Sequence, residues 1–187
     1  MKKLITIASG VLLLNLSVLA QGTISFQNVG PGFSAQIKDA AGSFIGPGAA
    51  VTVELLAGTT ASVAPFATPV TTSTWSGNGW FNVGQAPVVL NSFAGGSHPF
   101  FQVRVWDNSG GVNSYAAALA AGKATGISAV WQLVDGGGLS GLGNPSAVPP
   151  TTAPPLFGMT GFQMVPEPST IALGLLGVAA FLFRRRK

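Results

Sequence analysis

Hydrophobic and polar residues alternate along two segments in the middle of the chain, residues 50–57 and 100–106. In the second segment Phe101, Val103 and Val105 fall on one face, with polar or amphipathic side chains between them. A strand places alternate side chains on opposite faces, so this pattern is typical of a strand buried on one face. We therefore predict a strand in each segment and expect the second to be central in its sheet.

Shorter β-prone runs, separated by turn residues such as Gly, Asn, Asp and Ser, fill the rest of the middle. They predict further strands at residues 23–27, 80–83, 88–90, 127–134 and 160–164. A short helix is predicted from Tyr115 to Ala121, because Ser114 can cap its start and Gly122 can end it. The proline-rich stretch 144–155 is predicted to be a loop, because proline cannot donate to a strand ladder. Together these elements predict an all-β body with one short helix, a single β-sandwich for which a jelly roll is a candidate topology.

The N-terminal segment, 1–20, has the three-part order of a secretory signal peptide. Two lysines follow Met1, an apolar stretch runs from Leu4 to Leu16, and small or modest side chains precede the end of the segment at Ala20. We expect a signal helix that signal peptidase removes between Ala20 and Gln21. The chain is therefore predicted to be exported.

The C-terminal segment, 165–187, has its own order. Pro166, Glu167 and Pro168 come first, and an uncharged apolar run follows at 170–183. A terminal basic cluster then consists of Arg184, Arg185, Arg186 and Lys187. As a helix the run would be about 21 Å long, short of a hydrocarbon core of roughly 30 Å, but basic side chains at its end can snorkel to the interface. We predict a transmembrane helix with its basic end in the cytoplasm and the body outside.

This C-terminal segment resembles the PEP-CTERM sorting domain, in which a Pro-Glu-Pro motif, a hydrophobic helix and an arginine-rich end follow one another. Pro166, Glu167 and Pro168 match the motif, and Arg184–Arg186 match the basic end. In that family an exosortase, a cysteine peptidase embedded in the membrane, recognises the tail, and the proteins are exported by bacteria that make exopolysaccharide. The resemblance implies that the three motif residues are recognised by another enzyme and are not catalytic.

The body also resembles a recurrent group of such exported proteins, in Gln21–Phe26 and in Gln102–Asp107. That resemblance implies no activity. The chain is thus expected to consist of a signal peptide at 1–20, a β-sandwich body at 21–164 and a sorting and anchoring segment at 165–187.

The charge of the body is nearly balanced once the two ends are set aside. Residues 21–164 hold three basic and four acidic side chains, a net charge of −1. These side chains are Lys38, Arg104, Lys123, Asp39, Glu54, Asp107 and Asp135. A nucleic-acid partner would need a basic patch, so none is predicted. Because the chain has no cysteine, disulfides, thiolate metal sites and a cysteine nucleophile are excluded, and we predict neither a metal nor a cofactor.

Candidate catalytic side chains are few. His98 is the only histidine and lies in a predicted loop, so a Ser/His/Asp triad would have to be built around it alone. Glu54, Asp107 and Asp135 are candidates for the acid and base of a glycosidase, but nothing in their spacing brings two of them together. Asp107 and Asp135 also precede glycine-rich turns, where aspartate is expected for backbone reasons. We predict that the protein is not an enzyme.

The four tryptophans suggest another kind of site, because an exposed indole on a β-face can stack on a sugar ring. Trp106 is the best candidate, since it shares the polar face of its predicted strand with Arg104. The competing interpretation is core or edge packing, because large aromatic side chains usually bury most of their area. Trp106 and Arg104 are thus the candidate ligand contacts of the body.

Three hypotheses for function follow. The first is an exported, non-enzymatic cell-surface or extracellular-matrix protein, held at the membrane until its tail is processed and then associated with exopolysaccharide. The second is a carbohydrate-binding module that uses exposed tryptophans. The third is a polysaccharide hydrolase, which would lose turnover when Asp107 or Glu54 is replaced.

Overall fold

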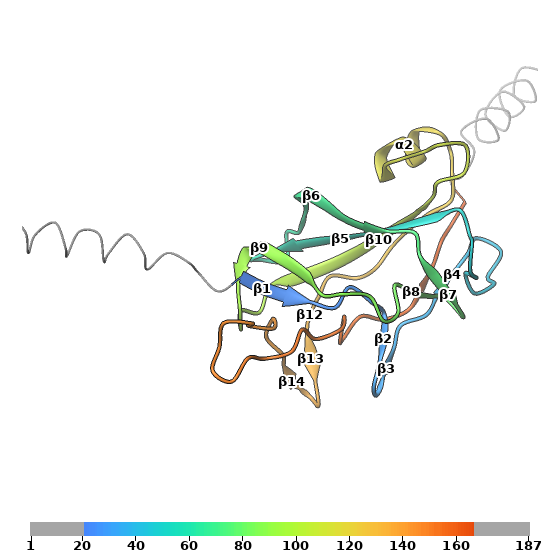
Figure 1. Ribbon diagram of the computed structural model, residues 1–187. Coiled ribbons are helices and arrows are strands. Elements are labelled where there is room, and N and C mark those ends of the chain that lie inside the picture. Colours follow the sequence, from blue (N-terminus) through green and yellow to red (C-terminus); the bar gives the residue numbers. More distant parts are fainter. Residues whose placement is uncertain (1–20, 167–187) are drawn as a thin grey trace, which may run out of the picture.

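The computed structural model describes residues 21–166, which form strands and one short helix (Figure 1). The strands are β1 (Gln21–Ile24), β2 (Val29–Gly30), β3 (Phe33–Ser34), β4 (Ile37–Lys38), β5 (Val51–Gly58), β6 (Ala64–Thr72), β7 (Trp75–Gly77), β8 (Trp80–Phe81), β9 (Val88–Ala94), β10 (Phe100–Asp107), β11 (Thr125–Ile127), β12 (Trp131–Gln132), β13 (Val134–Asp135), β14 (Gly138–Leu139) and β15 (Phe162–Gln163). The helix is α2 (Tyr115–Ala120). The predicted all-β body with one short helix is confirmed for these residues, and the predicted signal and transmembrane helices lie outside them.

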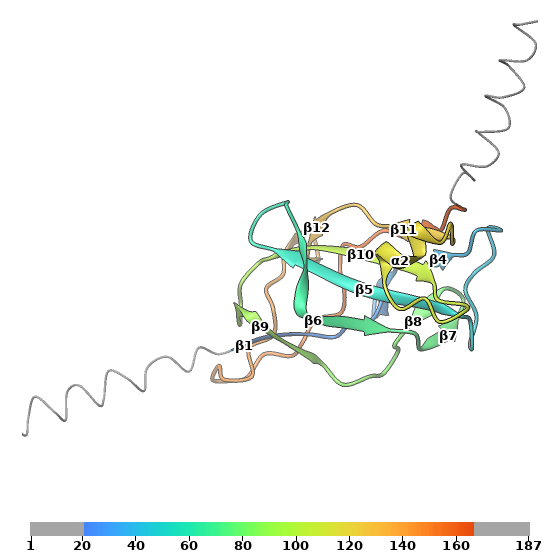
Figure 2. The ribbon, with the colours of Figure 1, turned by 90° about the horizontal axis from the view of Figure 1, so that it is seen from above.

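The largest sheet is antiparallel and is built around β10 and β5. Its strands lie in the order β11–β10–β5–β6, and β12 also pairs with β10 (Figure 2). Strands β10 and β5 pair continuously from Phe100 opposite Gly58 to Asp107 opposite Val51. Because β10 has partners on both of its sides, the prediction of a central strand at 100–106 is confirmed.

A layer of shorter pieces faces this main sheet (Figure 1). It contains the antiparallel pair β1–β9, the parallel pair β4–β15, the hairpins β2–β3 and β7–β8, and long loops. Alternate apolar side chains of β5 and β10, namely Val53, Leu55, Phe101, Val103 and Val105, are buried together with apolar side chains of the facing layer. The largest fully buried members are Phe81, Phe101, Ile24, Ile37, Leu55, Leu90, Leu133, Leu142, Leu156, Met164, Val53 and Val103.

The other face of the main sheet is covered in part by the segment that contains α2 (Figure 2). The helix begins after Ser114, whose hydroxyl accepts a hydrogen bond from the Ala117 N–H at 3.2 Å. It ends at Ala120, and Gly122 follows with a positive φ of 63°. The helix prediction is therefore confirmed to within one residue at its C-terminal end.

The strand prediction misses the short strands β2, β3, β4, β7 and β14, and it is wrong in two longer segments. The predicted strand 127–134 is interrupted after Ile127, because the hydroxyl of Ser128 accepts the Val103 N–H at 2.9 Å in place of a backbone carbonyl. No strand is predicted at β6, a nine-residue strand that contains Pro65 and Pro69. These prolines are tolerated because β6 lies at the edge of the main sheet, where an N–H donor can be absent without breaking a ladder.

A buried asparagine ties the facing layer together. Asn28 is fully buried, and its amide donates to the carbonyls of Ala35 (2.6 Å) and Gly79 (2.9 Å). Its oxygen accepts the N–H of Phe81 at 2.8 Å. Asn28 thereby connects its own segment with two others, one at Ala35 and one at Gly79–Phe81. Its side chain satisfies backbone groups that would be costly to bury unpaired.

The two ends of the described chain leave from opposite ends of the body (Figures 1 and 2). Gln21 pairs with Ala94 at one end, beside the segment that follows Leu142. Pro166 lies at the other end, next to β4 and β11. The predicted signal segment and the C-terminal sorting segment therefore attach to opposite ends of the folded body.

Candidate functional site

The most distinctive site is the junction at which the sorting segment leaves the body. Strand β15 lies parallel to β4, with Phe162 opposite Ile37 and Gln163 opposite Lys38. The N–H of the next residue, Met164, donates to the Lys38 carbonyl at 2.9 Å. The Met164 side chain is only 1% exposed and belongs to the core. The last strand before the sorting motif is therefore part of the folded body.

Val165 forms the final attachment. Its N–H donates to the Thr125 carbonyl at 2.7 Å, and its carbonyl accepts the Thr125 N–H at 3.1 Å. Thr125 is buried at the start of β11, whereas the Val165 side chain is 59% exposed and Pro166 is exposed. The hydrogen bonding of the body thus continues one residue into the predicted sorting segment, and Pro166 begins the motif directly at the surface of the fold.

The sequence offered only a weak indication of this junction. The prediction of a strand at 160–164 is confirmed in its central part by β15. The hydrogen-bond partners of Met164 and Val165 are Lys38, near the start of the body, and Thr125, which follows α2. No local pattern specifies such distant partners.

The other residues of the predicted targeting sites fall at or beyond the limits of the described chain. Gln21 is its first residue and is exposed, and the preceding Ala20 lies outside the described residues. Glu167, Pro168 and the cluster Arg184, Arg185, Arg186 and Lys187 also lie outside them. Their roles stay predictions from the sequence.

The structure does not support Trp106 as a stacking platform. Its side chain is 2% exposed, its ring meets the edge of the Tyr115 ring at 6.4 Å between centroids, and its Nε1 donates to the Val112 carbonyl at 3.3 Å. The indole face on which the sugar-binding prediction depended is covered, because the segment leading into α2 folds over it. Packing of Trp106 is the interpretation that the geometry favours.

Arg104 is occupied by structural contacts. Its Nε donates to Oε2 of Glu54 at 2.6 Å across the β10–β5 pair, and its guanidinium lies 5.0 Å from the centre of the Tyr115 ring. This is the one salt bridge within residues 21–166. The buried carboxylate of Glu54 thus has a charged partner, as burial of a carboxylate requires.

The remaining tryptophans are also engaged. Trp75 is buried and donates to the Val51 carbonyl at 2.9 Å. Trp80 and Trp131 are partly buried, and their Nε1 atoms donate to the Ser34 hydroxyl and to the Phe157 carbonyl. The indoles of the body therefore serve packing and internal hydrogen bonding.

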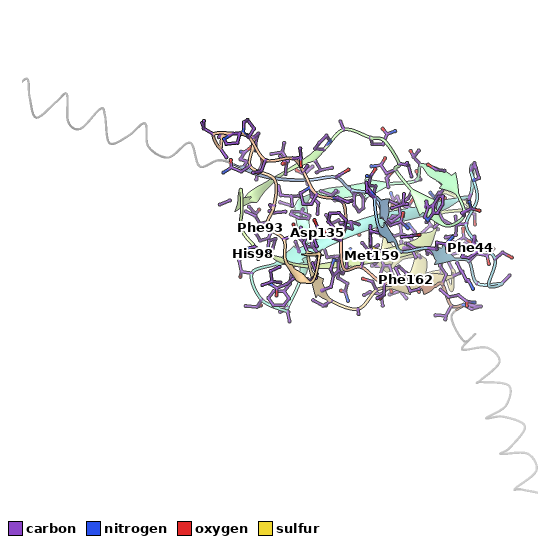
Figure 3. All side chains as sticks on the ribbon, turned by 90° about the horizontal axis from the view of Figure 1, so that it is seen from below. Phe44, Phe93, His98, Asp135, Met159 and Phe162 are labelled. Atoms are coloured by element: carbon purple, nitrogen blue, oxygen red, sulfur yellow. The ribbon has the colours of Figure 1, made fainter. Side chains whose placement is uncertain are left out.

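The candidate catalytic carboxylates do not converge. Glu54 lies on the face of the main sheet that α2 covers, whereas Asp107 falls on the alternate face at the end of β10. Asp135 lies on the exposed β13–β14 hairpin, and His98 is exposed in the loop before β10 (Figure 3). Within residues 21–166 no group of three or more His, Asp or Glu side chains is placed to hold a metal ion.

Asp107 has a structural partner set of its own. Its carboxylate accepts the Ser109 N–H at 2.8 Å, and Lys123 donates to the Ser109 hydroxyl at 2.8 Å. Partial burial by itself would raise the pKa of Asp107, but the hydrogen bonds from Ser109 and the charge of Lys123 outweigh that effect and leave the pKa below its ordinary value. Asp107 is therefore held ionised in a turn, a poor state for a general acid.

Two hollows in the described surface bear on function. The first, of about 480 Å³, is a groove between β6 and β9. Its lining includes the exposed polar side chains of Thr68, Thr71, Asn91 and Ser92, and it includes no charged residue. The sequence does not reveal this groove, because the pattern does not predict β6.

The second hollow, of about 510 Å³, lies beside the junction. Apolar side chains form most of its lining, including Phe44, Ile45, Val51 and Met164. Phe44 is 46% exposed at its rim. An apolar hollow thus adjoins the point where the sorting segment leaves the body.

The comparisons with known proteins bear on the C-terminal segment. Residues 165–187 match the family model of the PEP-CTERM protein-sorting motif. The resemblance seen in the sequence is confirmed: the chain carries a PEP-CTERM protein-sorting motif at residues 165–187, and this motif implies export. This motif implies transient anchoring in the membrane before sorting and processing by an exosortase, which is itself a membrane protein.

Neither a curated protein nor a solved structure matches the chain. Residues 21–166 contain no helix with the length and hydropathy that a bilayer crossing needs. Because no match covers the body, its function is argued from its own residues.

Proposed function

We propose that this protein is a non-enzymatic structural component of the cell surface or extracellular matrix, delivered there by an exosortase and associated with exopolysaccharide. One observation carries the proposal: the matched sorting motif begins at the last residue that the folded body holds by hydrogen bonds. The folded body is thus attached to the sorting segment with no linker between them. Signal peptidase acts at the other end of the chain, after Ala20.

The engagement of the charged side chains supports a non-enzymatic role. Glu54 is paired with Arg104, and Asp107 is bonded within its turn. Asp39 accepts the N–H groups of Ala41 and Ser43, both at 2.9 Å. A hydrolase would need two carboxylates flanking one glycosidic bond, and these three side chains have separate structural tasks.

The arrangement of the strands supports classing the body as an irregular β-sandwich. The main sheet forms one layer, and β1–β9 with β4–β15 and the two small hairpins forms the other. Apolar side chains from both layers interdigitate between them, which is the packing that defines a sandwich. The short strands and long loops of the second layer fit a passive surface module.

The sorting step is tested by intact mass and cell fractionation in a host that has an exosortase. We expect the wild-type product to lack residues 1–20 and the segment after the Pro-Glu-Pro motif. The Glu167→Ala variant should stay uncut in the membrane fraction, whereas Asp135→Ala, which removes an exposed carboxylate on the β13–β14 hairpin, should be processed normally. An uncut wild-type tail would make the protein a permanently anchored surface protein and would remove the exosortase step.

A carbohydrate-binding module is the second candidate, favoured by the β6–β9 groove and not by the tryptophans. Exposed hydroxyl and amide groups next to apolar side chains such as Phe66 match the mixed polar and apolar surface of a sugar chain. Pro65 and Pro69 remove backbone donors from β6, so the groove is poorly suited to an added peptide strand. The candidate sugar-binding surface is thus the β6–β9 groove and not the tryptophan face expected from the sequence.

A pull-down on insoluble polysaccharides separates the two candidates. A binding module should show saturable binding that falls at least tenfold in the Thr71→Ala/Asn91→Ala double variant, an estimate that assumes about 1 kcal/mol for each lost hydrogen bond. The matched control is Asn113→Ala, which removes an exposed amide outside the groove. A structural component without this site should show no saturable binding in any of the three proteins.

A further inference from the structure

We propose that the end of the body from which the sorting segment leaves is a membrane-contact surface that rests on the outer face of the bilayer while the tail is uncut. We call this surface the exit face; it consists of Lys38, the loop 39–50 and Val165. The inference rests on the proposed anchoring of the tail. It adds a defined face of the body, and a defined orientation, to that proposal.

The tether between body and membrane is very short. Two backbone hydrogen bonds to Thr125 fix Val165, and the apolar run of the tail begins at Thr170. Residues 166–169 lie between them, so Val165 and Thr170 are separated by five residue steps, which span at most about 18 Å even when fully extended. The bilayer therefore lies within this distance of Val165, so the exit face must lie close to its surface.

Buried contacts keep the tether from lengthening. Releasing more chain would require β15 to separate from β4 and Met164 to leave the core. Undocking this fully buried methionine would expose its apolar side chain to water and lose its packing contacts, so it is unfavourable. The fold thus keeps the tether short, and the tail keeps the body close to the bilayer.

The exit face has the chemistry of an interfacial surface. Phe44 and Val165 are large exposed apolar side chains, and the hollow between loop 39–50 and Met164 is mostly apolar. The ammonium of Lys38 lies 5.2 Å from the centre of the Phe44 ring, which combines an aromatic group with a cation. Aromatic rings and lysines with apolar stems are typical of the headgroup region of membranes.

Charge does not drive this contact. Lys38 and Lys123 near the junction are matched by Asp39 and Asp107, so this end of the body has no excess of positive charge. A surface attracted to anionic lipid would need such an excess. The contact is instead set by the tether and by apolar groups, and it should depend little on salt.

The opposite end of the body provides an internal control. Figure 3 shows Phe44 and Phe162 near the end where the described chain finishes, and Phe93 and His98 at the other end. Val148, in the proline-rich loop 144–155, is almost fully exposed, and this loop is attached to the segment of β1 through the hydrogen bond from the Ser25 N–H to the Pro154 carbonyl. An exposed apolar side chain of similar character is therefore available far from the exit face.

The test uses the natural absence of cysteine, which allows a label at one chosen position. The full chain from Gln21 to Lys187, with Phe44→Cys, Ala41→Cys or Val148→Cys, is labelled with an environment-sensitive fluorophore. It is then reconstituted in phosphatidylcholine vesicles that contain lipids with a nitroxide quencher near the headgroup. Without an exosortase the tail stays uncut.

Quenching at positions 44 and 41 should be several-fold stronger than at position 148 and should change little when salt is raised. Equal or absent quenching at all three positions, in protein that floats with the vesicles, would overturn the exit face while leaving the anchoring intact. Protein that fails to float with the vesicles would overturn the anchoring itself, and the exit face with it. A Gly-Ser linker of about 12 residues between Val165 and Pro166 should lower quenching at position 44, because it removes the geometric restraint.

Discussion

Asp107 illustrates how a single acidic side chain in this protein serves the fold. It ends β10, accepts the Ser109 N–H and lies near Lys123, which is bonded to the Ser109 hydroxyl. Its position before a glycine-rich turn was evident in the sequence, but the partnership with Lys123 was not. That lysine comes from beyond α2, and the chain brings it back only because the helix packs on the sheet.

The lowered pKa of Asp107 predicts a pH-dependent contribution to stability. Because the folded pKa lies below the unfolded value of about 3.9, the ionised carboxylate stabilises the fold above that pH, and the effect is lost as pH falls through the folded pKa. Asp107→Asn in the released body should therefore lower the melting temperature at neutral pH and should match the wild type in strong acid.

Thermal unfolding followed by circular dichroism at several pH values measures this difference. Asp135→Asn is the matched control, because its carboxyl group is exposed on the β13–β14 hairpin. A destabilisation by Asp107→Asn that persisted unchanged in acid would mean that the side chain acts through packing and not through its charge.

Strand β15 shows that the end of the body is a structural element and not a linker. It pairs in parallel with β4, and parallel neighbours cannot be recognised from a local hairpin pattern. The run 160–164 does predict a strand, but its partner lies near the start of the body. This element therefore pairs an early segment of the body's sequence with its last segment, and it sets the place where the sorting segment begins.

Removal of this element should destabilise the body. The chain 21–161 lacks Met164 and the hydrogen bonds to Lys38 and Thr125, so we expect it to unfold at much lower urea than 21–166. Met164→Ala alone should cost about 2–5 kcal/mol, while Gln163→Ala, on an exposed side chain of the same strand, should change stability by less than about 0.5 kcal/mol.

Urea titration of the four proteins measures these effects as shifts in the unfolding midpoint. Equal midpoints for 21–161 and 21–166 would show that β15 contributes nothing to the fold. In that case the tether would include residues before Val165 and would be longer. The exit face would then not be forced to lie close to the bilayer.

In the whole molecule, the arrangement of the two ends connects the fold with delivery. Gln21 and Pro166 lie at opposite ends of the body, so the predicted signal peptide and the sorting segment are attached far from each other (Figure 1). The exit end would face the bilayer before processing, and the groove between β6 and β9 would stay open to the outside. In this arrangement the body can bind or pack while its tail is still held.

The sequence by itself determined the sorting motif of this protein and the class of its fold. A targeting segment is recognised by the order of its residues along the chain and does not need a folded structure. The order of proline-containing, apolar and basic residues was therefore sufficient to identify the sorting motif, and the match to the family model confirms this identification. The alternation in β5 and β10 likewise specifies a buried face, because a period of two is a local property of a strand.

Only the tertiary structure decided which polar and aromatic residues are available. The pattern placed Trp106 and Glu54 on a polar face, but α2 and the segment before it cover that face, so both side chains are buried. The buried carboxylate of Glu54 is paired with the guanidinium of Arg104 in a salt bridge. Asn28 in the same way acquires three hydrogen-bond partners from two other segments. Exposure and pairing depend on contacts between residues far apart in the chain, and alternation within a strand contains no information about them.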